Sequence, residues 1–308
     1  MKRCDLLLEQ LQREGFGERL LLNEPLSRHT SFAVGGPADV LIVAYTTDEL
    51  ARLTRLAWLL GVPVLILGGG TNVLVADAGV RGLVIINGCE RYAVSAEGLL
   101  TVESGKRLAE LARWTVAEGW AGLQWAVGIP GTVGGAVVGN AGAYGGCMAD
   151  SVRAVRLLLP GDGIKRVGVE ALEYGYRTSA LKRQSGQSRR AVVLEAELAL
   201  TPGDPKALAE ETARINALRA ERTPKGCCAG SMFKRTVQYP AGFLIEQAGL
   251  KGYRIGGAQV SPVHANFLMN TGNATAADVR ALMTKVQQEV WQTFAQHLEP
   301  EVELVGEW

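Results

Sequence analysis

The chain has 308 residues, and its 32 basic and 31 acidic residues leave a net charge of +1. This balance argues against nucleic acid or an anionic membrane surface as the main partner, although a few local cations could hold a small anionic substrate. The hydrophobic share of 47% is that of an ordinary folded protein, and the length suits two or three domains.

The longest apolar run, residues 56–70, is interrupted by Gly61, Pro63 and three further glycines, and it falls short of the roughly 20 residues that cross a bilayer. The charged N-terminal residues do not form a signal-peptide pattern. The cysteines are odd in number and have no CxxC spacing: Cys4, Cys89, Cys147, Cys227 and Cys228. We therefore expect a reduced, cytoplasmic protein without a metal site. Cys227-Cys228 is interpreted as two small, partly buried thiols, with a redox-sensing pair as the alternative.

In chain order, the pattern predicts a short helix within residues 1–20 and then a β-α-β unit. The unit consists of a strand at 40–44, a helix from a capping box at Thr46 and Glu49 to Leu60, and a strand at 62–67. Residues 83–200 are mostly strands, with one helix predicted at 108–118.

After residue 200 the predicted elements change from mostly strands to mostly helices. Asp204 and Pro205 predict a helix start, with the helix running to about Arg219, and a second helix is expected at 240–248. Thr275 and Asp278 cap the longest predicted helix, whose apolar residues recur at helical spacing. A strand at 302–305 follows.

Three glycine-rich loops are the strongest chemical signal. Residues 128–146 contain eight glycines among nineteen residues, which predicts a stretch unable to pack a core but open to a flat or phosphate-bearing ligand. Gly68-Gly69-Gly70-Thr71-Asn72 follows a strand but matches neither GxGxxG nor a P-loop, so alone it could be a plain turn. With a further glycine turn at 28–37, the loops favour a large dinucleotide.

Gly230-Ser231-Met232-Phe233-Lys234 sets a hydroxyl beside a cation, which suggests a proton donor. Near the C-terminus, Glu299, Glu301 and Glu303 would share one face of an extended segment. The residues alone do not select one of these three carboxylates.

Many of these segments resemble the UDP-N-acetylenolpyruvoylglucosamine reductase family, over roughly residues 20–308 and in the family's order. The N-terminal half carries Thr30-Ser31-Phe32, Val34-Gly35-Gly36-Pro37-Ala38, the Gly-Gly-Gly-Thr-Asn loop and the segment 128–146. The C-terminal half carries Tyr176-Arg177-x-Ser179, Ala229-Gly230-Ser231-x-Phe233-Lys234, Ala248–Gly252, Ile255–Ala258 and Leu298-Glu299-Pro300-Glu301-Val302.

The resemblance implies an α/β and α+β fold. A two-lobed FAD-binding domain, similar to that of PCMH-type flavoenzymes, would comprise residues 1–85 and 86–200. A C-terminal α+β substrate-binding domain would comprise 201–308, with the final strand returning to the flavin.

The resemblance also implies the chemistry. NADPH reduces non-covalently bound FAD, and the flavin then reduces the enolpyruvyl ether of UDP-N-acetylglucosamine enolpyruvate to UDP-N-acetylmuramate, a peptidoglycan precursor. Arg177 would stabilise the developing enolate, Glu301 would assist at the enolic oxygens, and Ser231 would protonate the α-carbon. The partners would be these small molecules, with no nucleic acid or membrane, and the protein would be a monomer.

Further residues are assigned by the same resemblance. Predicted cofactor-binding residues are Gly35, Gly36, Gly68, Gly69, Gly70, Thr71, Asn72, Gly128, Ile129, Pro130, Gly131, Thr132, Gly134, Gly135, Asn140, Ala141 and Gly142. Predicted substrate-binding residues are Tyr176, Lys234, Arg235 and Lys251.

The chain departs from the family pattern at three places. Arg235-Thr236 replaces Asn-Pro or Arg-Pro, and Cys227-Cys228 replaces a turn with Pro and Ser. The region from Tyr176 to Val192 is short, as in a compact subgroup without a long tyrosine-bearing loop. Two rival functions are another flavin oxidase or dehydrogenase and a non-catalytic flavin-binding protein. The first should lack the Gly-Ser-x-Phe-Lys and Pro-Glu-Val segments, and the second should have lost Ser231, Arg177 or Glu301.

Overall fold

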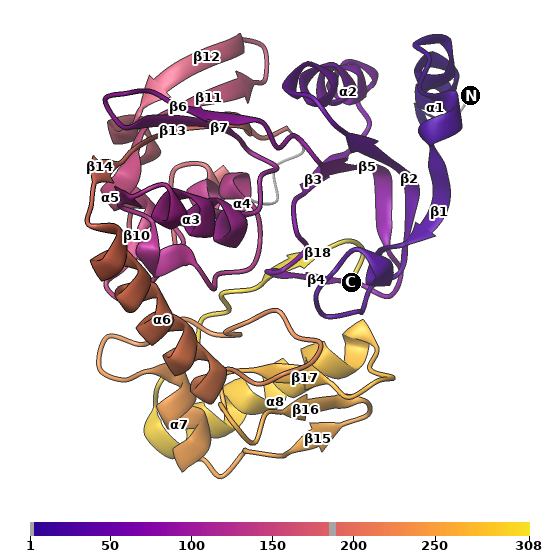
Figure 1. Ribbon diagram of the computed structural model, residues 1–308. Helices are drawn as coiled ribbons and strands as arrows, with labels where there is room; N and C mark the ends of the chain where they lie inside the picture. Colours follow the sequence, from indigo (N-terminus) through magenta and orange to yellow (C-terminus); the bar gives the residue numbers. More distant parts are fainter. Residues whose placement is uncertain (1–2, 185–188) are drawn as a thin grey trace. The chain divides into compact units, whose positions relative to one another are not determined.

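The computed structural model describes residues 3–184 and 189–308 (Figure 1). The segment 176–192, predicted to be short, therefore includes four residues, 185–188, that lie outside the described residues. The α-helices are α1 (Arg3–Arg13), α2 (Thr47–Leu60), α3 (Leu108–Ala117), α4 (Val133–Gly139), α5 (Met148–Ser151), α6 (Pro205–Arg222), α7 (Ala241–Gln247) and α8 (Ala276–Phe294). None of the described helices combines the length and the apolar character needed to cross a bilayer.

The strands form several small sheets rather than one large one. In chain order they are β1 (Leu21–Pro25), β2 (Pro37–Ala44), β3 (Val64–Leu67), β4 (Val73–Val75), β5 (Val80–Asn87), β6 (Tyr92–Val94), β7 (Leu99–Glu103), β8 (Trp120–Ala121), β9 (Gly142–Ala143), β10 (Gly146–Cys147), β11 (Val152–Leu159), β12 (Gly163–Gly168), β13 (Val192–Ala199), β14 (Thr201–Pro202), β15 (Arg254–Ile255), β16 (Ala258–Val260), β17 (Leu268–Asn270) and β18 (Glu303–Val305).

The chain divides into two compact units that are not continuous in sequence. Unit 1 comprises residues 1–22, 40–68 and 82–219, and unit 2 comprises 23–39, 69–81 and 220–308. Two loops of the N-terminal half thus belong to unit 2. The division at residues 85 and 200 expected from the sequence remains a prediction.

The first core of unit 1 contains the predicted β-α-β segment. β2, α2 and β3 form as expected, and Thr46 caps α2 by accepting the Glu49 backbone N–H at 3.1 Å. The sheet order is β1-β2-β5-β3, so β5 lies between the two strands of the unit and pairs with β3 in parallel. Leu7 and Leu11 of α1 pack in one core with buried residues of α2 and the sheet.

The second core of unit 1 is built on an antiparallel sheet of order β12-β11-β13-β7-β6. α3 and α4 contribute buried residues to this core. Here one expectation was wrong. The glycine-rich stretch does pack a core, because residues 133–139 form a helix whose Val133, Ala136 and Val137 are buried. Helical spacing places these three on one face and leaves Gly135 and Gly139 on the other.

Unit 2 is an α+β arrangement. β15, β16 and β17 form an antiparallel sheet, and α7 and α8 share one buried core with it. The predicted capping box of α8 is confirmed, with Thr275 and Asp278 each accepting the other's backbone N–H. Near the C-terminus, β18 pairs in parallel with β4, so the last strand lies beside the segment that follows the Gly68–Asn72 turn.

Candidate functional site

The turn that follows β3 has the geometry of an anion cradle. Gly70 has a φ of +60°, and a Cβ there would lie 2.1 Å from the backbone oxygen of His29, so only glycine fits. Within the described residues, the backbone N–H groups of Gly69, Gly70 and Thr71 have no hydrogen-bond acceptor in the protein. Consecutive unpaired donors on a turn are suited to the diphosphate of a dinucleotide. This part of the chain fits FAD.

Gly35 and Gly36, also in unit 2, pack against the segment that contains Val75, Ala76 and Asp77. A Cβ on Gly36 would lie 2.0 Å from the backbone oxygen of Asp77, and one on Gly35 would lie 2.9 Å from the Val75 Cβ. Gly36 donates its N–H to the Ala76 carbonyl at 3.0 Å. These glycines let two backbone segments pack closely, and their predicted contact with the cofactor stays a prediction.

In unit 1, α4 offers a backbone face without side chains. Gly135 and Gly139 are four residues apart on this helix, so they lie on the same face. Among the described residues, a Cβ on Gly139 would meet no heavy atom within 4 Å, and one on Gly135 would meet only the Thr132 hydroxyl at 3.7 Å. A flat ligand could therefore approach the helix backbone directly.

The glycines at the start of α4 serve close packing instead. Thr132 is the N-cap and accepts the Gly135 N–H at 3.4 Å. A Cβ on Gly68, at the end of β3, would lie 2.4 Å from the Thr132 hydroxyl oxygen, and one on Gly134 would lie 2.9 Å from the Ser104 Cβ. The predicted cofactor residues Gly68, Thr132 and Gly134 thus meet in unit 1.

The loop that carries Arg177 is attached to the C-terminal end of α4. Asn140 donates its side-chain N–H to the Gly175 carbonyl at 3.0 Å, and Ser179 donates its hydroxyl to the Val138 carbonyl at 2.6 Å. Gly175 and Thr178 exchange backbone hydrogen bonds at 3.1 and 3.3 Å, which closes a tight turn around Tyr176 and Arg177. The structure thus places Arg177 next in sequence to residues fixed on the glycine-bearing helix.

Within this turn, Arg177 has a φ of +54°, a strained value for a residue with a Cβ. Its guanidinium lies 6.0 Å from the centre of the exposed Tyr176 ring. Burial raises the pKa of Tyr174, which lies three positions before Arg177 in the sequence.

In unit 2, the segment from Ser231 to Lys234 pairs with the segment from Glu299 to Glu301. Lys234 donates its backbone N–H to the Glu299 carbonyl at 2.9 Å, and Glu301 donates to the Met232 carbonyl at 2.8 Å. Phe233 and Pro300 form the antiparallel bridge between these bonds. The structure thus brings Ser231 and Glu301, which are 70 positions apart in the sequence, to neighbouring extended segments.

The same segment connects through Asn72 to the turn that follows β3. The Asn72 side-chain N–H donates to the Glu301 carbonyl at 3.1 Å, and the Glu303 N–H donates to the Asn72 carbonyl at 3.0 Å. Three predicted functional elements of unit 2 therefore share one hydrogen-bonded framework: the turn, the Glu301 segment and the Ser231 segment.

Asn266 is a positioning residue that the sequence pattern did not indicate. It is buried, and its side chain accepts the Phe233 N–H at 3.0 Å and donates to the Phe233 carbonyl at 2.8 Å. Its own carbonyl accepts the Met232 N–H at 2.8 Å. These three bonds fix the backbone directly after Ser231. A single Asn in the stretch His264–Phe267 gives no periodic signal that would have identified it.

Two of the predicted substrate-binding residues of unit 2, Lys234 and Lys251, form ion pairs with carboxylates. The Lys234 ammonium lies 2.5 Å from a carboxylate oxygen of Glu299, and the Lys251 ammonium lies 2.7 Å from one of Glu246. Arg235 is exposed. A substrate phosphate that binds Lys234 or Lys251 would have to replace these carboxylates.

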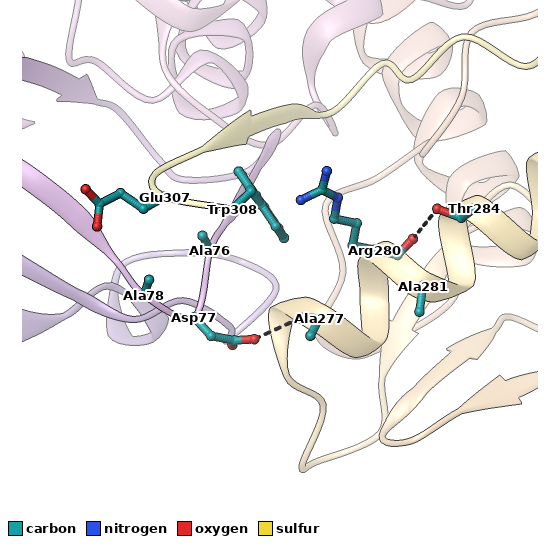
Figure 2. Close-up of a pocket in the computed structure, with 9 residues that line it drawn as sticks. All are labelled: Ala76, Asp77, Ala78, Ala277, Arg280, Ala281, Thr284, Glu307 and Trp308. Carbon is teal, nitrogen blue, oxygen red and sulfur yellow. Dashed lines mark hydrogen bonds between the residues drawn. The ribbon is translucent and has the colours of Figure 1, made fainter.

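A separate hollow in unit 2 contains none of the predicted site residues. It has a volume of about 450 Å³ and is lined by Ala76, Asp77, Ala78, Ala277, Arg280, Ala281, Thr284, Glu307 and Trp308 (Figure 2). Arg280 stacks over the Trp308 ring at 4.8 Å. Asp77 accepts the backbone N–H groups of Ala276 and Ala277 at 2.8 and 2.9 Å, so its carboxylate caps α8.

Residues 223–305 match the C-terminal domain of UDP-N-acetylenolpyruvoylglucosamine reductase, and residues 38–168 match an FAD binding domain. The enzyme of that name from Alkaliphilus oremlandii is 42% identical over 290 residues, covering 94% of both chains. The one from Rubrobacter xylanophilus is 44% identical over 291 residues, covering 92% of this chain and 95% of its own. The chain belongs to the UDP-N-acetylenolpyruvoylglucosamine reductase family.

A solved structure agrees with this assignment. The UDP-N-acetylenolpyruvylglucosamine reductase from Thermus caldophilus superposes with a TM-score of 0.78 at 34% identity, covering 93% of this chain and 98% of its own. Family membership confirms the expected flavoprotein oxidoreductase, the FAD-binding and C-terminal domains, and the use of FAD with NADPH. The roles of individual residues remain predictions.

Proposed function

We propose that this reductase converts UDP-N-acetylglucosamine enolpyruvate to UDP-N-acetylmuramate, with Ser231, Glu301 and Arg177 as its catalytic residues. Bound FAD would supply the hydride, with NADPH as its reductant. The observation that supports the residue assignment is the pairing of the Ser231 segment with the Glu301 segment, joined through Asn72 to the anion-binding turn.

Ser231 is proposed to protonate the substrate. Hydride addition at the β-carbon of the enolpyruvyl group leaves negative charge at the α-carbon and the carboxylate, and the α-carbon then needs a proton. A free serine is a weak acid, but an enolate carbon is a strong base. Lys234 follows three residues later and would stabilise the alkoxide that remains.

Glu301 and Arg177 are proposed to act on the enolate oxygens. The guanidinium of Arg177 is planar and can give two parallel hydrogen bonds to a carboxylate or enolate. Glu301 orients the same oxygens. Arg177 belongs to unit 1 and the other two residues belong to unit 2, so their convergence on one substrate is part of the proposal.

Substrate binding and cellular role complete the proposal. Lys234, Arg235, Lys251 and Tyr176 hold the sugar nucleotide, whose diphosphate suits cations. The product feeds peptidoglycan precursor synthesis and thereby cell-wall formation, cell shape and division. We infer a cytoplasmic location, because the five cysteines are free and odd in number. A monomeric state is part of the same proposal.

The two half-reactions test the role of Ser231. Ser231→Ala should be reduced by NADPH at close to the rate of the unmodified enzyme, because hydride transfer to the flavin needs no carbon protonation. Its reoxidation by the enolpyruvyl substrate should be slower by about 10²–10⁴-fold, the usual contribution of a positioned acid. Stopped-flow absorbance of the flavin measures both rates.

Two further variants serve as references for this test. Ser231→Cys should be intermediate, since a thiol also donates a proton. Thr284→Ala removes an exposed α8 hydroxyl that donates to the Arg280 carbonyl at 3.1 Å, and it should leave both half-reactions unchanged. If Ser231→Ala slows both half-reactions equally, or neither, Ser231 is a structural turn residue.

A further inference from the structure

Two adjacent thiols precede the Ser231 segment, and the proposed reaction does not use them. Cys227 and Cys228 are both free, with Cys227 exposed and Cys228 half-buried. Burial raises the pKa of Cys228, and the neighbouring Cys227 adds to this shift. Ala229 and Gly230 separate the pair from Ser231. Gly230 has a φ of +76°, and among the described residues no heavy atom lies within 4 Å of a Cβ added there.

The backbone of the cysteine pair is part of the framework of the site. The Cys228 carbonyl accepts the Ser31 hydroxyl at 2.7 Å, and Ser31 donates its backbone N–H to the Gly70 carbonyl at 3.0 Å. The Cys227 carbonyl accepts the Asn270 N–H at 2.9 Å. The peptide groups of the pair therefore contribute to the position of both the anion-binding turn and the segment that leads to Ser231.

We propose that Cys227 and Cys228 are a site of reversible oxidation, at which hydrogen peroxide forms a disulfide between the two neighbours and thereby slows the half-reaction that depends on Ser231. This inference rests on the proposed role of Ser231. The exposed Cys227 thiolate attacks the peroxide oxygen and hydroxide leaves, giving a sulfenic acid. The Cys228 thiol then displaces water and forms the S–S bond. The two sulfurs lose two electrons, and the peroxide is reduced to two molecules of water.

The geometry of adjacent residues makes such a bond strained. Neighbouring Cα atoms across a trans peptide are about 3.8 Å apart, whereas disulfides usually join Cα atoms about 4.4–6.8 Å apart. Closing the bond requires the peptide between Cys227 and Cys228 to distort, which reorients the carbonyls held by Asn270 and Ser31. Strained disulfides are easily reduced, so the oxidised state should be reversible.

The experiment uses the holoenzyme treated with hydrogen peroxide and then freed of oxidant. Intact mass and a non-reducing peptide map should show the loss of two hydrogens on the peptide that contains Cys227 and Cys228. Flavin reduction by NADPH should be nearly unchanged. Reoxidation by the enolpyruvyl substrate should be about 10- to 100-fold slower, because a misplacement of about 1 Å can cost about 10²-fold. Dithiothreitol should restore both mass and rate.

Cysteine variants separate this site from other thiols. Cys227→Ser should keep its reoxidation rate after the same treatment. Cys147→Ser, which removes a half-buried thiol in unit 1, should remain as sensitive as the unmodified protein. The proposal is overturned if no disulfide forms, if it forms without slowing reoxidation, or if Cys227→Ser is equally sensitive. Failure of the untreated enzyme to be reoxidised by substrate would instead refute the proposed function, which the untreated sample tests separately.

Discussion

At the scale of single residues, the backbone conformation of Arg177 gives an indication of function. Its φ of +54° lies in the region that favours glycine. A residue with a Cβ keeps such a conformation only when its surroundings impose it, and such residues concentrate at functional sites. The bonds from Asn140 and Ser179 to the loop and to α4 supply that constraint. The strain therefore supports a functional role for this side chain.

Arg177→Lys should severely lower turnover although the charge is kept. A lysine ammonium cannot present two parallel donors to a planar carboxylate or enolate. Because these bonds strengthen as the enolate forms, kcat should fall more than substrate affinity. Steady-state kinetics measure both values, and the thermal midpoint serves as a control for folding. A variant with near-normal kcat would remove Arg177 from the site.

At the scale of the elements, α4 has glycines on an open face, Gly135 and Gly139, and a glycine packed against Ser104, Gly134. Gly135→Ala and Gly139→Ala should stabilise the apoprotein by up to about 1 kcal/mol each, because alanine favours helix over glycine. Both should weaken FAD binding, since the added methyl groups occupy the open face. Thermal unfolding of the apoprotein and FAD titration by fluorescence measure the two effects.

Gly134→Ala is the matched control on the same helix. Its methyl group would lie 2.9 Å from the Ser104 Cβ and 3.0 Å from the Ser104 carbonyl oxygen, so it should destabilise the apoprotein itself. Unchanged FAD affinity in both Gly135→Ala and Gly139→Ala would show that the open face of α4 does not contact the cofactor.

We predict that the stability of the fold depends on pH through Asp278, in the first turn of α8. Backbone N–H groups of Thr275 and Gly257 hold the pKa of Asp278 below its usual range. Because the folded pKa is below the unfolded one, the carboxylate stabilises the fold above the unfolded pKa of about 4, and this contribution is lost as the pH falls through the folded pKa. Asp278→Asn should be less stable at pH 7, with the difference in thermal midpoint shrinking below about pH 4. A constant difference across this range would contradict the assignment.

At the scale of the whole molecule, the N-terminal half of the chain contributes segments to both units. Residues 23–39 and 69–81 belong to unit 2, while the strands that flank them belong largely to unit 1. Phe32, Val34 and Leu74 from these segments are buried in the core that α7 and α8 share. The anion-binding turn therefore folds with the C-terminal domain, although it directly follows a strand of the FAD-binding domain.

The flavin of the whole protein should be held without a covalent bond. The described cradle consists of backbone N–H groups and glycines, and His29, the nearest candidate for attachment, has its ring 3.0 Å from the Glu24 carboxylate. Acid precipitation should release all the flavin to the supernatant, as measured by absorbance. Yellow colour that stays with the pellet would contradict this.

The sequence by itself determined the elements whose signals are local. The Thr46 cap of α2, the capping box of α8, the Asp204 start of α6 and the apolar face of α8 follow from neighbouring residues, because caps and helical periodicity act within a few positions. The full capping box predicted for α2 does not form, because the Glu49 carboxylate accepts the Tyr45 N–H and pairs with Arg19. The motif resemblance determined the family and selected Glu301 among three similar carboxylates.

Tertiary structure decided what depends on contacts between distant segments. Residues 133–139 are rich in glycine, yet they form a core helix, because Val133, Ala136 and Val137 pack against buried residues of the antiparallel sheet. The composition of the segment alone does not show that packing partner. Asn266 acquired its role because its amide meets the backbone of Phe233, 33 positions away. Likewise, Ser231, Glu301 and Asn72 lie on segments that are far apart in the sequence and are joined by hydrogen bonds in the fold. Backbone N–H and C=O groups can pair with any segment that folding brings beside them, so the sequence alone does not show which groups pair.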